Sequence, residues 1–250
     1  FGKMPIDSTQ KTIFVAVILC FLCSMLVSFA AVNLKSFQLV NKVRDKQKNI
    51  LQVAGLYYKG MDVEQSFSSF EPMIVDINKG LYTDRFDPKN FNDLKAASDP
   101  MLSVALDDDP ASIGRRTNFA TIYLLKNKDE TIDKIILPIH GYGLWSTLYG
   151  FVALEEDGNE IYGLQFYQHS ETPGLGGEVD NPKWKGQWSG KKIRNKDGEM
   201  MIQVAKTPGV KEYHVDAIAG ATLTSNGVHN LVRYWFCLLY TSPSPRDPIG

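Results

Sequence analysis

The first strong hydropathy pattern is an uncharged apolar run, "TIFVAVILCFLCSMLVSFAAVNL", from Thr12 to Leu34. As a helix, its central part from Ile13 to Val32 would span about 30 Å, the thickness of a bilayer's hydrocarbon core. The alternatives are a buried core helix and a cleaved signal peptide, and "SFAAV" imitates a cleavage site. Signal peptides normally have a shorter apolar region. The pattern therefore favours a permanent single-pass transmembrane helix at 12–34, behind a short tail at 1–11.

A helical pattern continues after this segment. Apolar residues recur among polar ones with helical spacing at Val40, Val43, Ile50, Val53 and Leu56. They predict a juxtamembrane helix over 35–58, broken near Gly55. Residues 61–110 alternate short apolar runs with Asp, Asn and Pro, which predicts short strands and turns. The acidic run at 107–109 lacks the spacing of a calcium loop and indicates a solvated turn.

Strand signals dominate from residue 119 onward. Segments rich in Ile, Val, Tyr and Phe include "FATIYLLKN", "TIDKIILPIHGYG", "LYGFVALEE" and "EIYGLQFYQHS". "LEEDGNEIYGL" predicts a hairpin that turns at 157–159, and "KIRNKDGEMMIQVAK" predicts a similar turn at 197–198. The regular strand–helix alternation of a doubly wound fold is absent, as are GxGxxG and GxxxxGK[ST] patterns. We therefore expect an α+β domain with a mixed sheet over 59–236, without a nicotinamide or nucleoside-triphosphate site.

An amphipathic helix follows near the end of the chain. Its apolar residues are spaced i, i+3, i+4, i+7 and i+8, at Val228, Leu231, Val232, Trp235 and Phe236. We expect its N-terminus at 224–226. Gly220 and three hydroxyl residues, Thr222, Thr224 and Ser225, lie at this end. One interpretation is an ordinary N-cap supplied by Thr224 or Ser225. The other is an anion site, because free N–H groups and the helix dipole favour a phosphate, with a hydroxyl as its attachment point.

The amino-acid composition excludes several classes of function and of metal site. The formal net charge of −1 lacks the basic excess expected of a nucleic-acid-binding protein. The three cysteines, Cys20, Cys23 and Cys237, leave a long thiol-free stretch between them, which excludes a disulfide scaffold or a thiolate-bound zinc or iron–sulfur site there. The four histidines are scattered and form no convincing triad or proton relay. No catalytic residue is predicted.

Two motifs resemble FMN-binding domains. "DAIAGAT" is similar to the flavinylation motif Asp-x-x-Ser/Thr-Gly-Ala-Thr, and contributes Asp216, Gly220, Ala221 and Thr222. The resemblance implies that Thr222 carries FMN through a phosphoester bond, with Thr224 as the fallback acceptor. The chain departs from the motif at Ala219, where Ser or Thr is usual. The acceptor threonine itself is intact.

The second motif is a glycine-rich loop that resembles Glu-Thr-Pro-Gly-Leu-Gly in the same domains. Its residues are Glu171, Thr172, Pro173, Gly174, Leu175 and Gly176. The glycines allow the backbone to approach a flat ligand, with Leu175 free to pack on a ring, whereas a surface turn is the simpler interpretation. "GYGLWST" at 141–147 also resembles the family. It offers Leu144 and Trp145 as pocket residues, although a tryptophan is more often part of a core.

Over residues 8–236 the chain resembles the C subunit of the sodium-translocating NADH:quinone oxidoreductases. The resemblance implies a flavoprotein with covalent FMN that relays electrons from an iron centre in the membrane subunits to the FMN of the B subunit. It implies the B, D and E subunits and the NADH-oxidising F subunit as partners, and a flavin transferase for maturation. The whole complex oxidises NADH, reduces a quinone such as ubiquinone and exports sodium, and this subunit alone does none of these. The alternatives are the equivalent G subunit of the Rnf ferredoxin:NAD oxidoreductase and a membrane-anchored binding or assembly module without cofactor.

Topology and the final residues give two further expectations. Five Lys and Arg residues follow the apolar run within 35–48 and two precede it, a count that places the domain in the cytoplasm. The resemblance instead implies the periplasmic side of the bacterial inner membrane, and we favour it because long domains translocate largely regardless of charge. The Ser/Pro-rich end, "CLLYTSPSPRDPIG" at 237–250, predicts a disordered tail and resembles translated vector sequence.

Overall fold

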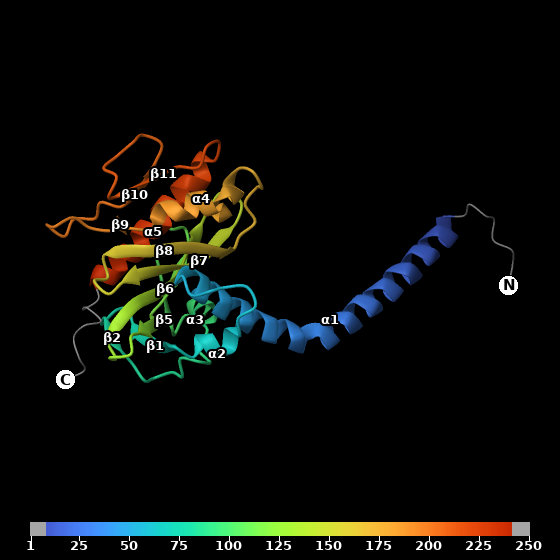
Figure 1. Ribbon diagram of the computed structural model, residues 1–250. Coiled ribbons are helices and arrows are strands. Elements are labelled where there is room, and N and C mark those ends of the chain that lie inside the picture. Colours follow the sequence, from blue (N-terminus) through green and yellow to red (C-terminus); the bar gives the residue numbers. More distant parts are fainter. Residues whose placement is uncertain (1–8, 242–250) are drawn as a thin grey trace. The chain divides into compact units, whose positions relative to one another are not determined.

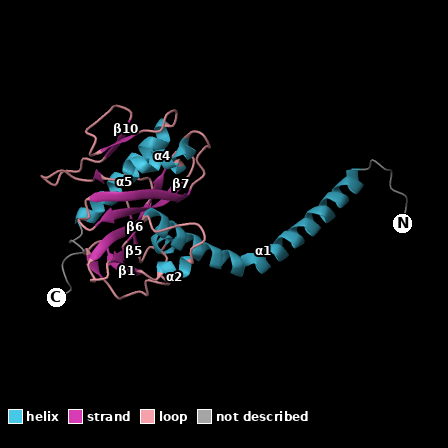
Figure 2. Ribbon diagram, viewed as in Figure 1, coloured by secondary structure: helices cyan, strands magenta, loops and turns pink. Residues whose placement is uncertain are grey.

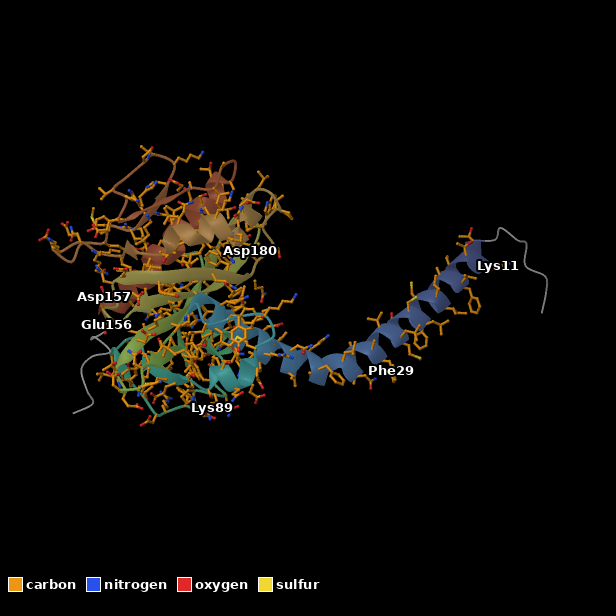
Figure 3. The ribbon with its side chains drawn as sticks, in the orientation of Figure 1. Lys11, Phe29, Lys89, Glu156, Asp157 and Asp180 are labelled. Atoms are coloured by element: carbon orange, nitrogen blue, oxygen red, sulfur yellow. The ribbon has the colours of Figure 1, made fainter. Side chains whose placement is uncertain are left out.

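A computed structural model describes residues 9–241 of the chain. The chain divides into two compact units, residues 1–46 and 47–250. The first consists, in its described part, of helix α1 (Thr9–Val53) up to Lys46. Within it, Thr9–Lys35 has a mean hydropathy of 2.8 in its most apolar window, and nothing in the structure buries that window. Its side chains, Phe29 among them, project outward from the helix (Figure 3). By length and composition this segment is able to cross a membrane.

The last turns of α1 belong to the second unit. Ile50 and Leu51 are completely buried there. The helix ends at Val53, two residues before the predicted break at Gly55 and five before the predicted boundary at residue 58. Gly55 stops it with a φ of +74°, and the Leu56 N–H donates to the Leu51 carbonyl, 2.9 Å away. A left-handed glycine with this backbone bond is a common helix terminator, so Leu56 lies beyond the helix.

A seven-stranded antiparallel sheet forms the centre of the second unit. Its order is β2-β1-β5-β6-β7-β8-β9 (Figure 1). The strands are β1 (Phe70–Asp76), β2 (Leu81–Tyr82), β5 (Phe119–Lys126), β6 (Ile132–Tyr142), β7 (Thr147–Glu155), β8 (Glu160–Gln168) and β9 (Lys191–Lys192). The predicted hairpin is confirmed, because β7 pairs with β8 in antiparallel register around 157–159. Long β6 and β7 pair from Lys134–Glu155 to Tyr142–Thr147.

Both faces of the sheet are buried, because alternate residues of each strand point to opposite sides. On β5, Ile122 and Leu124 pack into a cluster that contains the apolar stripe of α5 (Thr222–Thr241). Tyr123 and Leu125 pack on the other side, against the end of α1 and against α2 (Val63–Phe67). Figure 2 shows α5 and α4 (Pro182–Lys185) on one side of the strands and α2 on the other. The α+β class is confirmed, with helices on both faces of the sheet.

Smaller elements complete the unit. They are α3 (Asp93–Ser98), β3 (Ser103–Ala105), β4 (Arg115–Thr117), β10 (Gln203–Ala205), β11 (His214–Asp216) and the 3-10 turns η1 (Gly176–Asp180) and η2 (Gly186–Trp188). Strands β10 and β11 form a parallel pair, which makes the strand set mixed. Strands β1, β2 and β3 confirm the short strands predicted for 61–110, but the helices α2 and α3 in the same segment were not predicted. Each is capped by a side chain, Asp62 or Asn92, that accepts backbone N–H groups.

The C-terminal helix is longer than predicted at both ends. It begins at Thr222, two residues before the expected start, and continues to Thr241. The predicted disordered tail at 237–250 therefore starts inside a helix, and its residues 242–250 lie outside the described part of the chain. The amphipathic stripe itself is confirmed, since Val228, Leu231 and Val232 are all at most 1% exposed. Cys237, like Cys20 and Cys23, is an exposed free thiol.

His140 on β6 makes the stability of this unit depend on pH. Its ring stacks on Tyr149 at 5.7 Å and lies 5.0 Å from the Trp235 ring. Burial lowers the pKa of His140 to about 4, against a small raising effect of Asp109. An unfolded histidine titrates near 6.5. The unfolded chain therefore binds a proton that the folded chain refuses between about pH 6.5 and 4, and stability falls as the pH falls through that window.

We expect His140→Phe to remove this dependence while keeping an aromatic ring in the stack. Between pH 7 and pH 5 the free energy of unfolding of the wild type should fall by about 2 kcal/mol more than that of the variant. Urea unfolding followed by tryptophan fluorescence measures this, because all four tryptophans lie in the second unit. Equal losses in both proteins would show that His140 is accessible to protons in the folded state.

Candidate functional site

The hydroxyl-rich turn presents one free hydroxyl. Gly220 precedes α5 with a φ of +75°, a left-handed conformation that other residues adopt only with strain. Thr222, the first residue of the helix, is exposed. Within the described residues 9–241, its hydroxyl has no hydrogen-bond partner. Thr222 is therefore placed where a reagent can reach its oxygen, at the positive end of a helix dipole.

The other two hydroxyls are buried and occupied. Thr224 is 1% exposed, and its hydroxyl donates to Glu171 Oε2 over 2.7 Å. Ser225 Oγ accepts the N–H of Ile218 at 2.9 Å and donates to the Ala221 carbonyl. The N-cap interpretation was wrong in detail, because both residues lie inside the first turn. Their hydrogen bonds stabilise the first turn of α5, whereas the Thr222 hydroxyl makes no such bond within the described residues.

Glu171 is the centre of the arrangement. Glu171 is only 5% exposed, and its carboxylate accepts four hydrogen bonds, one from Thr224 and three from successive backbone amides. Those amides belong to Leu144, Trp145 and Ser146, at 3.1, 3.0 and 3.2 Å from Oε1. Burial alone would raise the pKa of Glu171, but the bonds from Thr224 and the amides lower it below its ordinary value. The side chain is thus a buried, ionised acceptor that faces inward.

Three glycines make this close packing possible. A Cβ on Gly176 would lie 2.5 Å from Thr224 Oγ1, and one on Gly143 would lie 2.6 Å from Glu171 Oε1. A Cβ on Gly227 would lie 2.4 Å from the Tyr142 carbonyl oxygen. Real Cβ atoms essentially never approach other heavy atoms this closely, so a side chain at any of the three positions would force a neighbour to shift. The "GYGLWST" segment, the Glu171–Gly176 loop and the start of α5, separate in the sequence, therefore meet in space.

The rest of the glycine-rich loop faces outward. Thr172, Pro173, Gly174 and Leu175 are exposed, while Gly176 is buried. The Thr172 carbonyl accepts the N–H groups of Leu175 and Gly177, which closes a tight turn. Gly174 has a φ of +76°. Leu175 lies beside Gly220, since a Cβ there would be 3.2 Å from Leu175 Cδ2. The loop thus presents an exposed leucine next to the turn that leads to Thr222.

Exposed apolar side chains accompany the three segments. Trp145 is 66% exposed, Leu223 59% and Leu175 45%, and Leu144 is half-buried. Trp145 is therefore not a core residue, which was the main alternative for it. Leu223 was not singled out from the sequence, and its position directly after Thr222 was the available signal. Single exposed apolar residues are ordinary, but their presence in all three converging segments is a feature of ligand-binding surfaces.

Asp216 ends β11 and is exposed. Its backbone is held on both sides: its N–H donates to Gln187 Oε1 and its carbonyl accepts from Trp184 Nε1, each over 2.9 Å. Its carboxylate lies 3.0 Å from His214 Nε2. These contacts fix the strand that leads into the Ala219–Ala221 turn, so Asp216 has a positional role whether or not it touches a ligand.

The other histidines make structural contacts. His169 Nδ1 accepts the Glu171 N–H, and its Nε2 lies 2.9 Å from Asp180, which is labelled in Figure 3. His229 Nδ1 accepts the N–H of Val204. His140 is likewise held in the aromatic stack of β6, β7 and α5.

Comparison with known proteins identifies the family in which this arrangement of segments occurs. A family model described as an FMN-binding domain matches residues 143–236, which contain the "GYGLWST" segment from Gly143 onward, the Glu171–Gly176 loop and the start of α5. The C subunit of the Na(+)-translocating NADH-quinone reductase of Pseudomonas aeruginosa is 48% identical over 240 residues, covering 92% of each chain. The protein of that name from Vibrio anguillarum is 45% identical over 233 residues, covering 92% of this chain and 91% of its own. The chain belongs to this C-subunit family.

Solved structures of the family share the fold. NqrC of Shewanella oneidensis, 33% identical, matches with a TM-score of 0.72 and covers 78% of this chain and 93% of its own. The C subunit of the reductase from Parabacteroides distasonis, 27% identical, matches with a TM-score of 0.69, covering 86% and 98%. Membership in the C-subunit family confirms the resemblance over the anchor and the domain together, and it accounts for the apolar helix α1 as a membrane anchor.

Proposed function

We propose that this chain is the FMN-carrying electron-relay subunit of a sodium-translocating NADH:quinone reductase, with FMN joined to Thr222 Oγ through its phosphate. The observation that carries the attachment is the division of labour among the three hydroxyls. Thr224 and Ser225 are buried and bonded, whereas Thr222 is exposed at the start of α5. A hydroxyl that must be modified has to be reachable, and only Thr222 meets this requirement.

The surroundings of Thr222 fit FMN. The start of a helix offers free N–H groups and a favourable potential to a phosphate. Ala219, which stands where the motif usually has a hydroxyl residue, is exposed, and its small methyl group does not obstruct the approach to the turn. The exposed Leu175, Leu223 and Trp145 and the half-buried Leu144 offer apolar surface for a flat ring. The electron-carrying chemistry belongs to bound FMN, and the chain supplies the attachment, the ring surface and the anchor.

The apolar helix α1 and the family suggest where the domain lies and which subunits it contacts. We propose that α1 crosses the bacterial inner membrane and leaves the large domain in the periplasm, against the lysine and arginine count at 35–48. Covalent attachment prevents loss of FMN outside the cytoplasm. The partners are the B, D, E and F subunits, with electrons leaving to the FMN of the B subunit, and a flavin transferase that loads Thr222. NADH oxidation, quinone reduction and sodium export belong to the complex.

The G subunit of an Rnf complex remains the alternative within the same chemistry. The relatives from Pseudomonas and Vibrio are both named as the C subunit of a Na(+)-translocating NADH-quinone reductase, and each aligns with 92% of this chain. A module without cofactor would not need a free hydroxyl beside exposed apolar residues. The sodium-pump subunit is therefore the function that the site supports best.

Coexpression of the full chain with a bacterial flavin transferase tests the proposal. We expect a band at the mass of the chain that fluoresces in a denaturing gel, because a phosphoester survives denaturation whereas bound FMN dissociates. The same chain expressed without the transferase is the control and should give a dark band. A folded, dark chain in the presence of an active transferase would contradict the proposed attachment.

A further inference from the structure

The Glu171 carboxylate joins three segments that are far apart in the sequence. Oε1 accepts from the amides at 144–146, which lie 25 to 27 residues before it, and Oε2 accepts from Thr224, 53 residues after it. The Ser146 side chain adds a bond, accepting the Ser170 N–H at 2.7 Å. Hydrogen bonds to an ionised group are roughly twice as strong as neutral ones. One buried charge thus ties the turn that carries Trp145 to the first turn of α5.

The geometry of α5 links this contact to the attachment point. Successive residues of an α-helix are rotated by about 100°, so Thr222 points almost opposite to Thr224, two residues later. The bond from Thr224 to Glu171 therefore directs Thr222 outward, as its exposure shows. The same carboxylate holds the Trp145 amide. Glu171 therefore bonds both to the first turn of α5, which carries Thr222, and to the turn that carries Trp145.

We infer that Glu171 is a positioning residue, whose ionised carboxylate holds the Leu144–Ser146 turn against the first turn of α5 and so orders the flavin attached at Thr222. This inference rests on the proposed function. Glu171 belongs to the loop that resembles FMN-binding domains, and its inferred role is indirect, because the four hydrogen bonds to the carboxylate all come from the protein itself. Glu171 is not part of the proposed phosphoester, which joins Thr222 Oγ to the FMN phosphate and is formed by the transferase.

The test compares the full chain, coexpressed with the transferase, with Glu171→Ala and Glu171→Gln. Alanine removes all four bonds. Glutamine keeps the shape, offering Oε1 to the amides and Nε2 to Thr224, but it removes the charge. Three quantities are measured: in-gel fluorescence for attachment, visible circular dichroism of the flavin for its ordering, and hydrogen exchange of the amides at 144–146. The dichroism reports the orientation of the ring, which a change in global stability alone does not move.

We expect every variant to keep the fluorescent band. In Glu171→Ala the dichroism should be lost, and exchange at 144–146 should accelerate at least about tenfold, because bonds to a charged acceptor are lost. Glu171→Gln should lie between Ala and the wild type in both. Thr224→Val, which removes only the hydroxyl, covers the case in which Glu171→Ala does not fold. It should weaken the dichroism while the amides stay protected.

Wild-type dichroism and wild-type exchange in Glu171→Gln would overturn the inference, as would unchanged dichroism in Thr224→Val. A wild type without a fluorescent band would instead overturn the proposed function. In that event the exchange data still test the role of Glu171 separately from flavin attachment. Faster exchange at 144–146 in the glutamine variant depends on the carboxylate and not on the flavin.

Discussion

A chain with Thr222→Val should carry no covalent flavin at all. Valine has nearly the shape of threonine and lacks the oxygen that we propose as the acceptor. Residue 222 is exposed, so the exchange should change the free energy of unfolding by less than about 0.5 kcal/mol. The fluorescent band of a denaturing gel should disappear, while the circular dichroism of the protein backbone stays that of the wild type. The loss is complete because no other hydroxyl of the turn is exposed.

The matched control is Thr224→Val, which removes a hydroxyl two residues away. That hydroxyl is buried and donates to Glu171, so its removal should leave the fluorescent band in place. A second readout is the NADH:quinone reductase activity of membranes from a bacterium that lacks its own C subunit. The wild-type chain should restore activity and Thr222→Val should not. Persistent fluorescence in Thr222→Val, with a dark Thr224→Val, would move the attachment to the fallback residue.

Leu51→Ala should cost about 2–5 kcal/mol, the usual range for a leucine removed from a packed core. Leu51 is completely buried, although it lies in the helix that begins as the membrane anchor. It packs in the cluster with Tyr123, Ile136 and Phe151 on the sheet face opposite α5. The amide of Gln165 on β8 also donates to Asn49 and Gln52 on the same turns, each at 2.7 Å. The end of α1 is therefore part of the domain core.

Val43→Ala is the matched control, because Val43 lies on the same helix and is 59% exposed. It should change stability by less than about 0.5 kcal/mol. Urea unfolding of the full chain in detergent, followed by tryptophan fluorescence, measures both. Equal, small effects would show that the domain does not depend on the last turns of α1. A large effect of Leu51→Ala alone would mean that a fragment lacking residues 47–53 is a poor substitute for the whole chain.

Local patterns in the sequence predicted much of the fold. The spacing of Val228, Leu231 and Val232 predicted the buried face of α5, and Gly55 marked the end of α1 within two residues. The start of α5 was misplaced because hydroxyl residues favour caps over helix interiors. Inside the helix, Thr224 instead donates to the distant Glu171, and Ser225 bonds to Ile218 and Ala221 of the preceding turn. Helices α2 and α3 were missed because five or six residues are too few to show a helical period.

Contacts between distant residues could not be predicted in this way. The two FMN motifs identified the segments of the candidate site, and the structure places them around Glu171. Nothing local in "HSETPG" shows that the carboxylate turns inward, because its partners are Trp145 and Thr224, 26 and 53 residues away. The exposure of Thr222, beside a buried Thr224, is likewise a result of packing. The pairing of β1 with β5 has the same origin.

Peptide mapping of the full chain after coexpression with a flavin transferase tests the central claim most directly. Digestion and tandem mass spectrometry should give the peptide that contains the "GATLTSNG" segment with the added mass of FMN less one water, and fragmentation should place that mass on Thr222. Unmodified Thr222 with the mass on Thr224, or no modified peptide from a folded chain, would contradict the account of the site.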